Sequence, residues 1–394
     1  MNLSDFGKSP IRMGMIGGGD GSFIGAVHRA AAALDGQIQL VCGALSSTPE
    51  KAAISARNVG ISESRSYSTW ESMLASEAQL PANVRMQFVS IVTPNSTHVP
   101  IASAALQAGF HVMCEKPLAV TLEEAVQLRK IVESTGKILG VAHAYTGYPM
   151  IKEAREIIRT GKLGRLRKVI VEYMQGWLSE ENIVDGKGHW RSDPARAGIS
   201  GCMGDIGTHA ANLAEYVTGL QIEAVCAELT NFVPARALDD DGSVLMRMSD
   251  GVRGTISASQ VAAGEENNLT IRAYGELGGV EWRQQEPNTL LLKWLHEPTQ
   301  IIRTGGMVGS AAAASTRLPP GHPEGFFEAF ANLYRGFAGA VAAHEAGMAT
   351  KIDSTTFPDV DAGLRSMAFL QAVVESSRTD KWVSLEMGAA HGKN

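Results

Sequence analysis

The chain is poor in the residues that mark several classes of protein. It has only four cysteines among 394 residues, and none of them forms a C-x-x-C pair. This usage argues against a disulfide framework and against a cysteine-rich zinc site. Basic residues number 35 against 41 acidic ones, and the net charge is -6. A chain of this charge has no broad basic field, so nucleic acid is excluded as an expected partner.

Long apolar runs are lacking too. No uninterrupted apolar stretch reaches the roughly 20 residues that a membrane-spanning helix needs. The first residues, Met-Asn-Leu-Ser-Asp, lack the basic and apolar regions of a signal peptide. Since the cysteines are expected to be reduced and buried, we predict a cytoplasmic protein without membrane contact. The length of 394 residues predicts two domains.

Short apolar runs alternate with helical patterns in the first part of the chain. Alternation of this kind is typical of βαβ units and therefore of a parallel sheet with helices on both faces. We predict an α/β domain with a doubly wound Rossmann sheet over residues 1–144. The predicted strands cover residues 11–16, 38–45, 88–92, 110–114 and 137–142.

The pattern changes at about residue 145. After a predicted helix over 149–160, strand-like runs follow one another between 222 and 294 without helices between them. Such runs predict an α+β domain with a large, mostly antiparallel, open-faced sheet over residues 145–394. Two late amphipathic helices are expected over 326–344 and 360–376, the second of them able to pack back on the first domain. Residues 310–314 are expected to form a loop of small residues.

A glycine-rich segment follows the first predicted strand. Residues 17–25 read Gly-Gly-Gly-Asp-Gly-Ser-Phe-Ile-Gly and lead into a helical pattern, which is the context that a dinucleotide fingerprint requires. Glycines let the backbone approach a pyrophosphate, and the helix N-terminus attracts its charge. A purely structural strand–turn–helix corner is the alternative reading. The residues predicted here to bind the cofactor are Gly17, Gly19, Gly21, Ser22, Phe23 and Ile24.

The second predicted strand ends without the acidic residue that usually binds the ribose of NAD. The segment instead offers Ser46, Ser47 and, a little further on, Lys51. These groups could accept the 2′-phosphate of NADP, or the hydroxyls could simply cap the next helix. We predict NAD or NADP as the cofactor, with a slight preference for NADP.

Two separate clusters offer groups that can move a proton. Lys116 follows the fourth predicted strand, where ligands sit in open α/β sheets. Asp205 and His209 are four residues apart, so on a helix they share one face. Oxidation of a secondary alcohol needs a base at the hydroxyl and positive charge where the carbonyl forms. A surface lysine and a structural histidine are the alternatives on pattern alone.

Taken together and in this order, the motifs resemble the Gfo/Idh/MocA family of glucose–fructose oxidoreductases and inositol dehydrogenases. The resemblance rests on the glycine loop, Pro-Asn-x-x-His at 94–98, Glu-Lys-Pro at 115–117 and Asp-x-Gly-x-His at 205–209. It implies that Lys116 contacts the reacting hydroxyl, that His209 is the general acid/base, and that Asp205 binds a neighbouring hydroxyl and orients His209. It also implies a cis bond before Pro117.

The resemblance implies further contacts. The residues expected near the ribose and nicotinamide are Thr93, Pro94, Asn95, His98, Glu115 and Lys116. Trp190 and Arg191 are expected to line the substrate pocket. Tyr145 and Tyr148 are either lining or packing aromatics. His322 lies in a Gly/Pro-rich loop that resembles one in a sugar- and cyclitol-oxidising branch, where it would either reach substrate or remain a turn residue.

The sequence therefore predicts an NAD(P)-dependent oxidoreductase that interconverts a secondary ring hydroxyl and a ketone on a sugar, sugar derivative or cyclitol. We expect a small polyhydroxylated substrate and a homodimer or homotetramer formed through the second-domain sheet. A zinc site built from Asp205, His209 and His189 is the rival use of these residues, but the ligand spacing does not favour it, so no metal is predicted. The alternative functions are an NAD-dependent glycoside hydrolase with transient oxidation and a non-catalytic nucleotide-sensing regulator.

Overall fold

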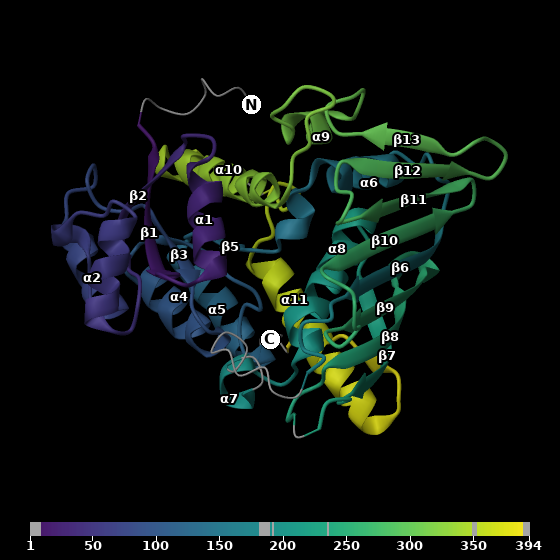
Figure 1. The fold of residues 1–394 in the computed structure, drawn as a ribbon, viewed down its shortest axis with the longest axis horizontal. Coiled ribbons are helices and arrows are strands. Elements are labelled where there is room, and N and C mark those ends of the chain that lie inside the picture. The colour runs from purple at the N-terminus through teal and green to yellow at the C-terminus, as the bar shows by residue number, and fades with distance from the viewer. Residues whose placement is uncertain (1–8, 181–189, 191–192, 235, 349–352, 389–394) are drawn as a thin grey trace, which may run out of the picture. The chain divides into compact units, whose positions relative to one another are not determined.

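The computed structural model describes residues 9–180, 190, 193–234, 236–348 and 353–388. It divides into two compact units (Figure 1), which are described one at a time. Unit 1 holds Met1–Leu118, Glu124–Gly147 and Phe326–Gly363; unit 2 holds Ala119–Glu123, Tyr148–Gly325 and Leu364–Asn394. The sequence-based boundary at 144/145 left the segment Phe326–Gly363 in the second domain, and the structure groups it with the first.

Unit 1 is built on a five-stranded parallel sheet with the order β2-β1-β3-β4-β5, which confirms the predicted Rossmann sheet. All residues of β3 and β4 are buried, as expected for parallel strands covered on both faces. The strands are β1 (Ile11–Gly17), β2 (Ile38–Ala44), β3 (Phe88–Val92), β4 (His111–Cys114) and β5 (Leu139–Val141).

Helices cover the sheet of unit 1. They are α1 (Phe23–Ala33), α2 (Pro49–Asn58), α3 (Trp70–Gln79), α4 (His98–Gln107), most of α5 (Leu122–Thr135) and α10 (Phe326–Glu345). Helix α3 was not predicted; the Thr69 side chain caps it by accepting the Ser72 N–H, and Met73 and Leu74 are buried. Helix α10 belongs here because its aromatic side chains enter the core. The rings of Phe337 and Phe88, for example, lie 5.1 Å apart.

Unit 2 is built on a nine-stranded sheet with the order β13-β12-β11-β10-β6-β9-β8-β7-β14. Strands β6 and β9 pair in parallel and the other neighbours are antiparallel, which confirms the predicted mostly antiparallel sheet. The strands are β6 (Leu166–Met174), β7 (Ile222–Thr230), β8 (Asp241–Met248), β9 (Arg253–Ser259), β10 (Asn268–Gly275), β11 (Gly278–Arg283), β12 (Thr289–Trp294), β13 (Gln300–Arg303) and β14 (Val383–Ser384).

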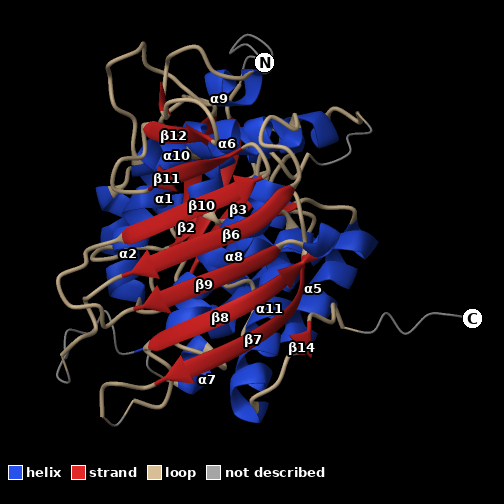
Figure 2. Cartoon of the chain, turned by 90° about the vertical axis from the view of Figure 1, so that its right-hand side faces the viewer, coloured by secondary structure: helices blue, strands red, loops and turns tan. Residues whose placement is uncertain are grey.

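The two faces of this sheet differ. Along β8, Val244 and Met246 are buried while Leu245 and Arg247 are exposed, which is the period of two expected for a sheet covered on one side. Helices α6 (Pro149–Arg159), α8 (Thr208–Thr218) and α11 (Val360–Thr379) lie on the buried side, and Figure 2 shows the strands in front of them. The described part of unit 2 leaves the other side, here named the open face, uncovered.

Residues Ser310–Ala314 form a short helix, α9, so the predicted loop is wrong at this point. Its run of four alanines has a high helix propensity, and Ala312 is buried where α9 packs on α6. The Gly309 N–H at its start donates to Glu153 Oε2 at 2.7 Å. The remaining short elements are α7 (Pro194–Ala197), the 3₁₀ turns η2 (Glu63–Arg65), η3 (Asn95–Thr97), η4 (Ala144–Gly147) and η7 (Ser249–Gly251), and the π-helical turn η6 (Met203–Gly207).

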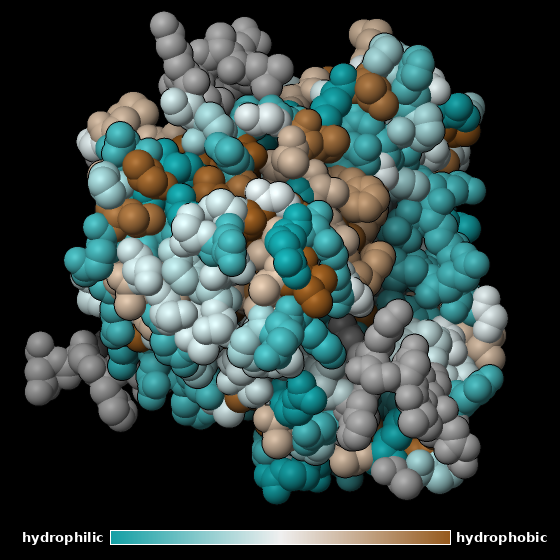
Figure 3. Space-filling model, turned by 60° about the vertical axis from the view of Figure 1, so that its left-hand side comes forward, coloured by the Kyte–Doolittle hydropathy of each residue, from teal (hydrophilic) through white to brown (hydrophobic). Residues whose placement is uncertain are grey.

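The surface is mixed in character. On the face drawn in Figure 3, apolar side chains occur in small groups among polar ones. No helix within the described ranges has the length and apolar character needed to cross a bilayer.

Candidate active site

The glycine-rich loop joins β1 to α1 by a close contact between backbones. A Cβ atom added at Gly25 would lie 2.3 Å from the carbonyl oxygen of Gly18, so only glycine fits there. Gly25 thus provides the close helix–strand contact that the last glycine of a standard fingerprint allows. Ser22 begins the helix, because its hydroxyl accepts the Gly25 N–H at 3.1 Å.

A cavity of ≈ 880 Å³ lies over this loop in unit 1. A volume of this size suits a cofactor site. The predicted residues that line it are Gly17, Gly19, Ser22, Ser46, Ser47, Lys51, Thr93 and Pro94. The predicted residues outside the lining are Gly21, Phe23, Ile24, Asn95, His98, Glu115 and Lys116. The glycine cradle, the helix N-terminus and the hydroxyl-rich wall fit a dinucleotide.

The cavity also contains charges that the sequence interpretation missed. Asp20 and Glu71 line it together with Lys51. The loop brings Asp20 against α2, where the Asn58 side-chain amide donates to Asp20 Oδ2 at 2.8 Å. The interpretation considered only the end of β2, whereas this carboxylate comes from the glycine loop itself. A carboxylate in this position can bind ribose hydroxyls and opposes an additional phosphate.

Lys116 lies at the carboxyl end of β4 and is half-buried. Its peptide bond to Pro117 is cis, as expected from the resemblance. The backbone N–H of Lys116 donates to Glu115 Oε2 at 3.0 Å, and the other carboxylate oxygen lies 2.7 Å from His28 Nε2. The described contacts of the Glu115 side chain therefore run to its own turn and to α1.

His98 links two loops of the site. One ring nitrogen lies 2.8 Å from the Pro117 carbonyl and the other lies 2.9 Å from the Thr93 carbonyl. Burial lowers the pKa of His98, and the two carbonyl contacts oppose that shift. The neutral ring carries one N–H and donates it to one of these carbonyls, so His98 lies between the Thr93 loop and the Lys116–Pro117 turn. Asn95 starts η3 and is also buried.

His143 is a buried residue near Lys116 that the motifs did not reveal. It follows β5 and is 1% exposed. Burial and the charge of Lys116 lower the pKa of His143 to about 3, so the imidazole is neutral at physiological pH. No motif contains it; only the parallel order of β4 and β5 brings it near Lys116.

In unit 2, Asp205 and His209 lie on consecutive helical turns. Asp205 is within the π-helical turn η6, and His209 is in the first turn of α8. Turns with π geometry often occur at functional sites. His209 is 8% exposed, and its ring centroid lies 6.4 Å from that of Tyr173 on β6. The two residues thus lie on one continuous helical stretch, and the predicted shared face remains a prediction because the π-helical turn departs from regular α-helical spacing.

Two further side chains hold this turn. Asp239 accepts the N–H groups of Gly201 and Met203 through its two carboxylate oxygens, at 2.8 and 2.9 Å. It thereby satisfies amide groups that a helix start leaves without partners. Gln260 donates from Nε2 to Asp205 Oδ2 at 2.9 Å and so orients that carboxylate. Neither residue was predicted, because both come from distant loops.

The other residues predicted to bind substrate differ in burial and in their neighbours. Tyr145 is buried with its ring 6.3 Å from that of Phe326, and the Tyr148 ring lies 5.2 Å from that of Trp282. These contacts favour packing roles for both tyrosines. His322 is exposed and its Nδ1 lies 3.2 Å from the Pro319 carbonyl, as in a turn. Trp190 is half-buried, while His189 and Arg191 lie outside the described residues.

Comparison with known proteins decides the family. A sequence profile described as an oxidoreductase family with an NAD-binding Rossmann fold matches residues 11–143. A second profile, described as the GFO/IDH/MocA C-terminal domain, matches residues 151–281. Together these matches cover more than half of the chain. The chain belongs to the Gfo/Idh/MocA family. It is therefore an oxidoreductase with an NAD-binding domain, as the motifs implied.

Several members of the family match along nearly the whole chain. The uncharacterized oxidoreductase YfiI of Bacillus subtilis is 34% identical, covering 96% of this chain and 98% of that protein. An inositol dehydrogenase homolog of Azotobacter vinelandii, solved with NAD+, is 36% identical with a TM-score of 0.91, covering 98% and 100% of the two chains. Levoglucosan dehydrogenase of Pseudarthrobacter phenanthrenivorans is 28% identical over 95% of this chain and 98% of that protein.

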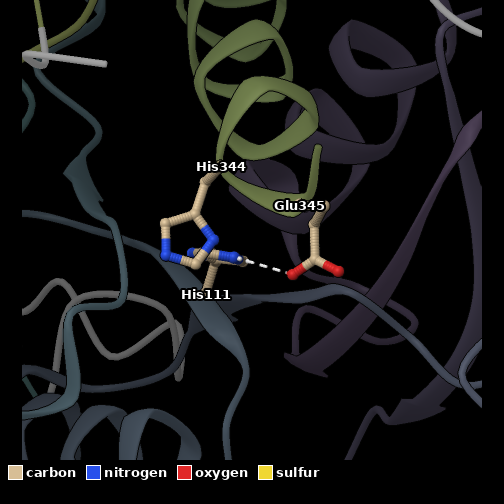
Figure 4. Close-up of side chains that lie close together, drawn as sticks. All are labelled: His111, His344 and Glu345. Carbon is tan, nitrogen blue, oxygen red and sulfur yellow. Dashed lines mark hydrogen bonds and ion pairs between the residues drawn. The ribbon is translucent and has the colours of Figure 1, made fainter. Parts of the chain in front are cut away.

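A second polar cluster of this family member lies apart from the cavity lining. In the described part of the chain, His111, His344 and Glu345 form the group whose potential ligand atoms lie within 4.8 Å of one another (Figure 4). The Ile138 N–H donates to His111 Nδ1 at 2.9 Å, so in the neutral ring the proton is on Nε2, which faces Glu345 Oε1 at 3.3 Å. A metal at Nε2 would have to displace that proton. The geometry favours a hydrogen-bonded cluster.

Proposed function

We propose that this enzyme interconverts a secondary ring hydroxyl and a ketone on a small polyhydroxylated ring, either a cyclitol of the inositol type or a sugar. The observation that carries the proposal is Lys116, which lies at the carboxyl end of β4 in the sheet whose β1 loop forms the dinucleotide cavity. The A. vinelandii homolog was also solved with NADH and myo-inositol, at 35% identity and a TM-score of 0.89 over 98% of this chain. A levoglucosan dehydrogenase complex adds support for a sugar ring.

The proposed roles follow from the chemistry of each group. The oxidised dinucleotide, when bound, accepts the hydride. Lys116 contacts the reacting hydroxyl and stabilises negative charge on its oxygen. His209 serves as general acid/base, and Asp205, oriented by Gln260, binds a neighbouring hydroxyl. Asp239 keeps the turn that carries Asp205 and His209 in place.

We propose NAD as the preferred cofactor. The sequence slightly favoured NADP because of Ser46, Ser47 and Lys51, and these residues do line the cavity. Asp20 and Glu71 line it as well, and two carboxylates beside a single lysine do not favour an additional phosphate. Relatives solved with NAD+ and NADH support the same choice.

A substrate panel tests the proposal. Purified protein is incubated with myo-inositol, other cyclitols, levoglucosan, free sugars and glycosides, separately with NAD+ and NADP+, while nicotinamide absorbance is followed. We expect reduction of NAD+ with at least one unphosphorylated cyclitol or sugar, and weaker activity with NADP+. Cleavage of a glycoside without net reduction would identify the hydrolase alternative, and inertness toward the whole panel would contradict the proposal.

We also propose that the open face of the nine-stranded sheet packs against a second copy of the chain. It exposes Leu245 on β8 and Ile301 on β13, which are 51% and 59% exposed. Exposed apolar side chains on an uncovered sheet are typical of an interface. Light scattering should give the mass of a dimer or tetramer; a monomer at micromolar concentration would contradict this.

A further inference from the structure

A buried chain of polar side chains lies beneath the Lys116 turn in unit 1. It joins four separate elements: Ser90 on β3, Tyr334 on α10, His28 on α1 and Glu115 after β4. The Ser90 hydroxyl lies 2.8 Å from the Tyr334 hydroxyl, which lies 2.6 Å from His28 Nδ1. His28 Nε2 lies 2.7 Å from Glu115 Oε1. The network ends at the backbone N–H of Lys116, which donates to Glu115 Oε2.

At the Glu115 end of this network, the direction of the hydrogen bond is determined. A carboxylate only accepts hydrogen bonds, so His28 must donate from Nε2 to an ionised Glu115. His28 Nδ1 then either accepts the Tyr334 hydroxyl or, in the charged ring, donates to it. Ser90 can supply the remaining donor or acceptor in both cases. Every member of the chain therefore has a partner, which a buried polar network requires.

The side chains of this network are shielded from water, which disfavours a charged group among them. His28 and Ser90 are 0% exposed and Tyr334 is 1% exposed. A carboxylate so placed loses hydration, yet the hydrogen bond and charge of His28 and the charge of Lys116 outweigh burial and lower the pKa of Glu115. The titratable groups that act on Glu115 or feel its charge are His28, Lys116, His98, His143, Cys114 and Tyr334.

We propose that His28 is a positioning residue for hydride transfer, which acts through Glu115 by holding that carboxylate against the Lys116 backbone amide and its negative charge beside the Lys116 side chain. Tyr334 and Ser90 keep the His28 ring in the orientation that directs Nε2 to Glu115. The inference rests on the proposed function, in which Lys116 contacts the reacting hydroxyl. It adds residues from α1, β3 and α10 that are not among those lining the cofactor cavity and that, in the proposed mechanism, do not contact the substrate.

The variants that test this inference change the charge beside Lys116. An anion close to an ammonium group favours its charged form, so removal of the anion should favour the neutral form. Glu115→Gln removes the charge and keeps the shape. His28→Leu removes the hydrogen-bond donor, so the pKa of the buried Glu115 carboxyl should rise and its negative charge should weaken. His28→Gln retains an amide donor for Glu115 and should rescue the effect.

The experiment measures kcat, KM and the pH profile of kcat/KM for the holoenzyme with its best substrate. In Glu115→Gln and His28→Leu we expect the alkaline limb, above which the Lys116 charge is lost, to move to lower pH by about one unit. We also expect kcat to fall on the order of 10- to 100-fold, since the lysine is less well positioned. Tyr334→Phe should shift the profile in the same direction by less, and His28→Gln should lie near wild type.

Tyr67→Phe is the matched control. It deletes a tyrosine hydroxyl that donates to another buried carboxylate of unit 1, Glu77 Oε1, at 3.0 Å. A purely structural role would give a lower Tm in both tyrosine variants and an unchanged pH profile. The inference is overturned if Glu115→Gln and His28→Leu, measured on folded protein, retain the wild-type alkaline limb and kcat.

A second readout does not depend on turnover. The rate at which acetic anhydride labels Lys116 is followed against pH by peptide mass spectrometry in cofactor-free protein. We expect the labelling midpoint of Glu115→Gln to lie below that of wild type, with Tyr67→Phe unchanged. If no panel substrate reacts, the proposed function fails while this measurement still decides the inference; equal midpoints in Glu115→Gln and wild type overturn it.

Discussion

Replacing Lys116 with alanine should lower kcat by about 10³-fold or more, the scale of a lost acid–base or charge-stabilising group. The cofactor should still bind, because Lys116 does not line the dinucleotide cavity. The KM of the ring substrate should rise as well if the lysine contacts the reacting hydroxyl. Steady-state kinetics and NADH binding followed by fluorescence check these two expectations separately.

Two further variants test this expectation more specifically. Lys116→Arg keeps a positive charge but cannot deprotonate, so it distinguishes charge stabilisation from proton transfer. Lys130→Ala removes an exposed lysine from α5 and should leave kcat unchanged. If Lys116→Ala keeps more than about a tenth of the wild-type kcat, a factor far smaller than a lost catalytic group gives, Lys116 is not the reacting group and the proposed mechanism is wrong.

The free energy of unfolding should fall steeply as the pH drops from about 6.5 toward 4. Burial, with Lys137 adding to it, lowers the pKa of His111 to about 4, and burial with Lys116 lowers the pKa of His143 to about 3. The unfolded chain takes up these protons from pH 6.5 downward and the folded chain does not, so stability rises with pH in this window. Each histidine contributes about 1.4 kcal/mol per pH unit.

The pH dependence of urea or thermal unfolding at fixed ionic strength measures this slope. His143→Asn should reduce it by about 1.4 kcal/mol per pH unit. His111→Asn should do the same while leaving an oxygen that can accept the Ile138 N–H in place of Nδ1. The lowered pKa of Glu115 adds a loss in the same direction at lower pH, which both variants retain. Equal slopes in wild type and both variants would contradict the assignment.

Most elements of the fold were predictable because the spacing of apolar residues along the sequence indicates which side chains of a helix or strand are buried. The strand over 88–92 and the helix starting at 149 match the observed β3 and α6. Helix α3 was missed because its polar residues hide the buried pair Met73 and Leu74. Helix α10 was predicted as a helix but placed in the wrong group of elements, because its pattern shows which face is apolar and not which core receives it.

The site divides in the same way. The glycine loop, Lys116 and the Asp205/His209 pair could be proposed from the sequence because each lies in a local motif with a chemical reason for its spacing. Asp20, His143, Asp239 and Gln260 were missed, because their roles depend on neighbours that are distant along the chain. No local pattern in the sequence marks these four residues as neighbours of the motifs.

The sequence by itself determined the family, the parallel and antiparallel sheets and the class of cofactor, and it supplied the proposed catalytic groups, since these depend on local periodicity and short motifs. Only the tertiary structure brings His28 within hydrogen-bonding distance of Glu115 and of Tyr334, and Tyr334 within that distance of Ser90. It also places carboxylates in the lining of the dinucleotide cavity together with Lys51. The physical reason is that hydrogen bonding and electrostatics act over a few ångströms in space. Ser90 and Tyr334 are 244 residues apart in the chain, and only folding brings their hydroxyls to 2.8 Å.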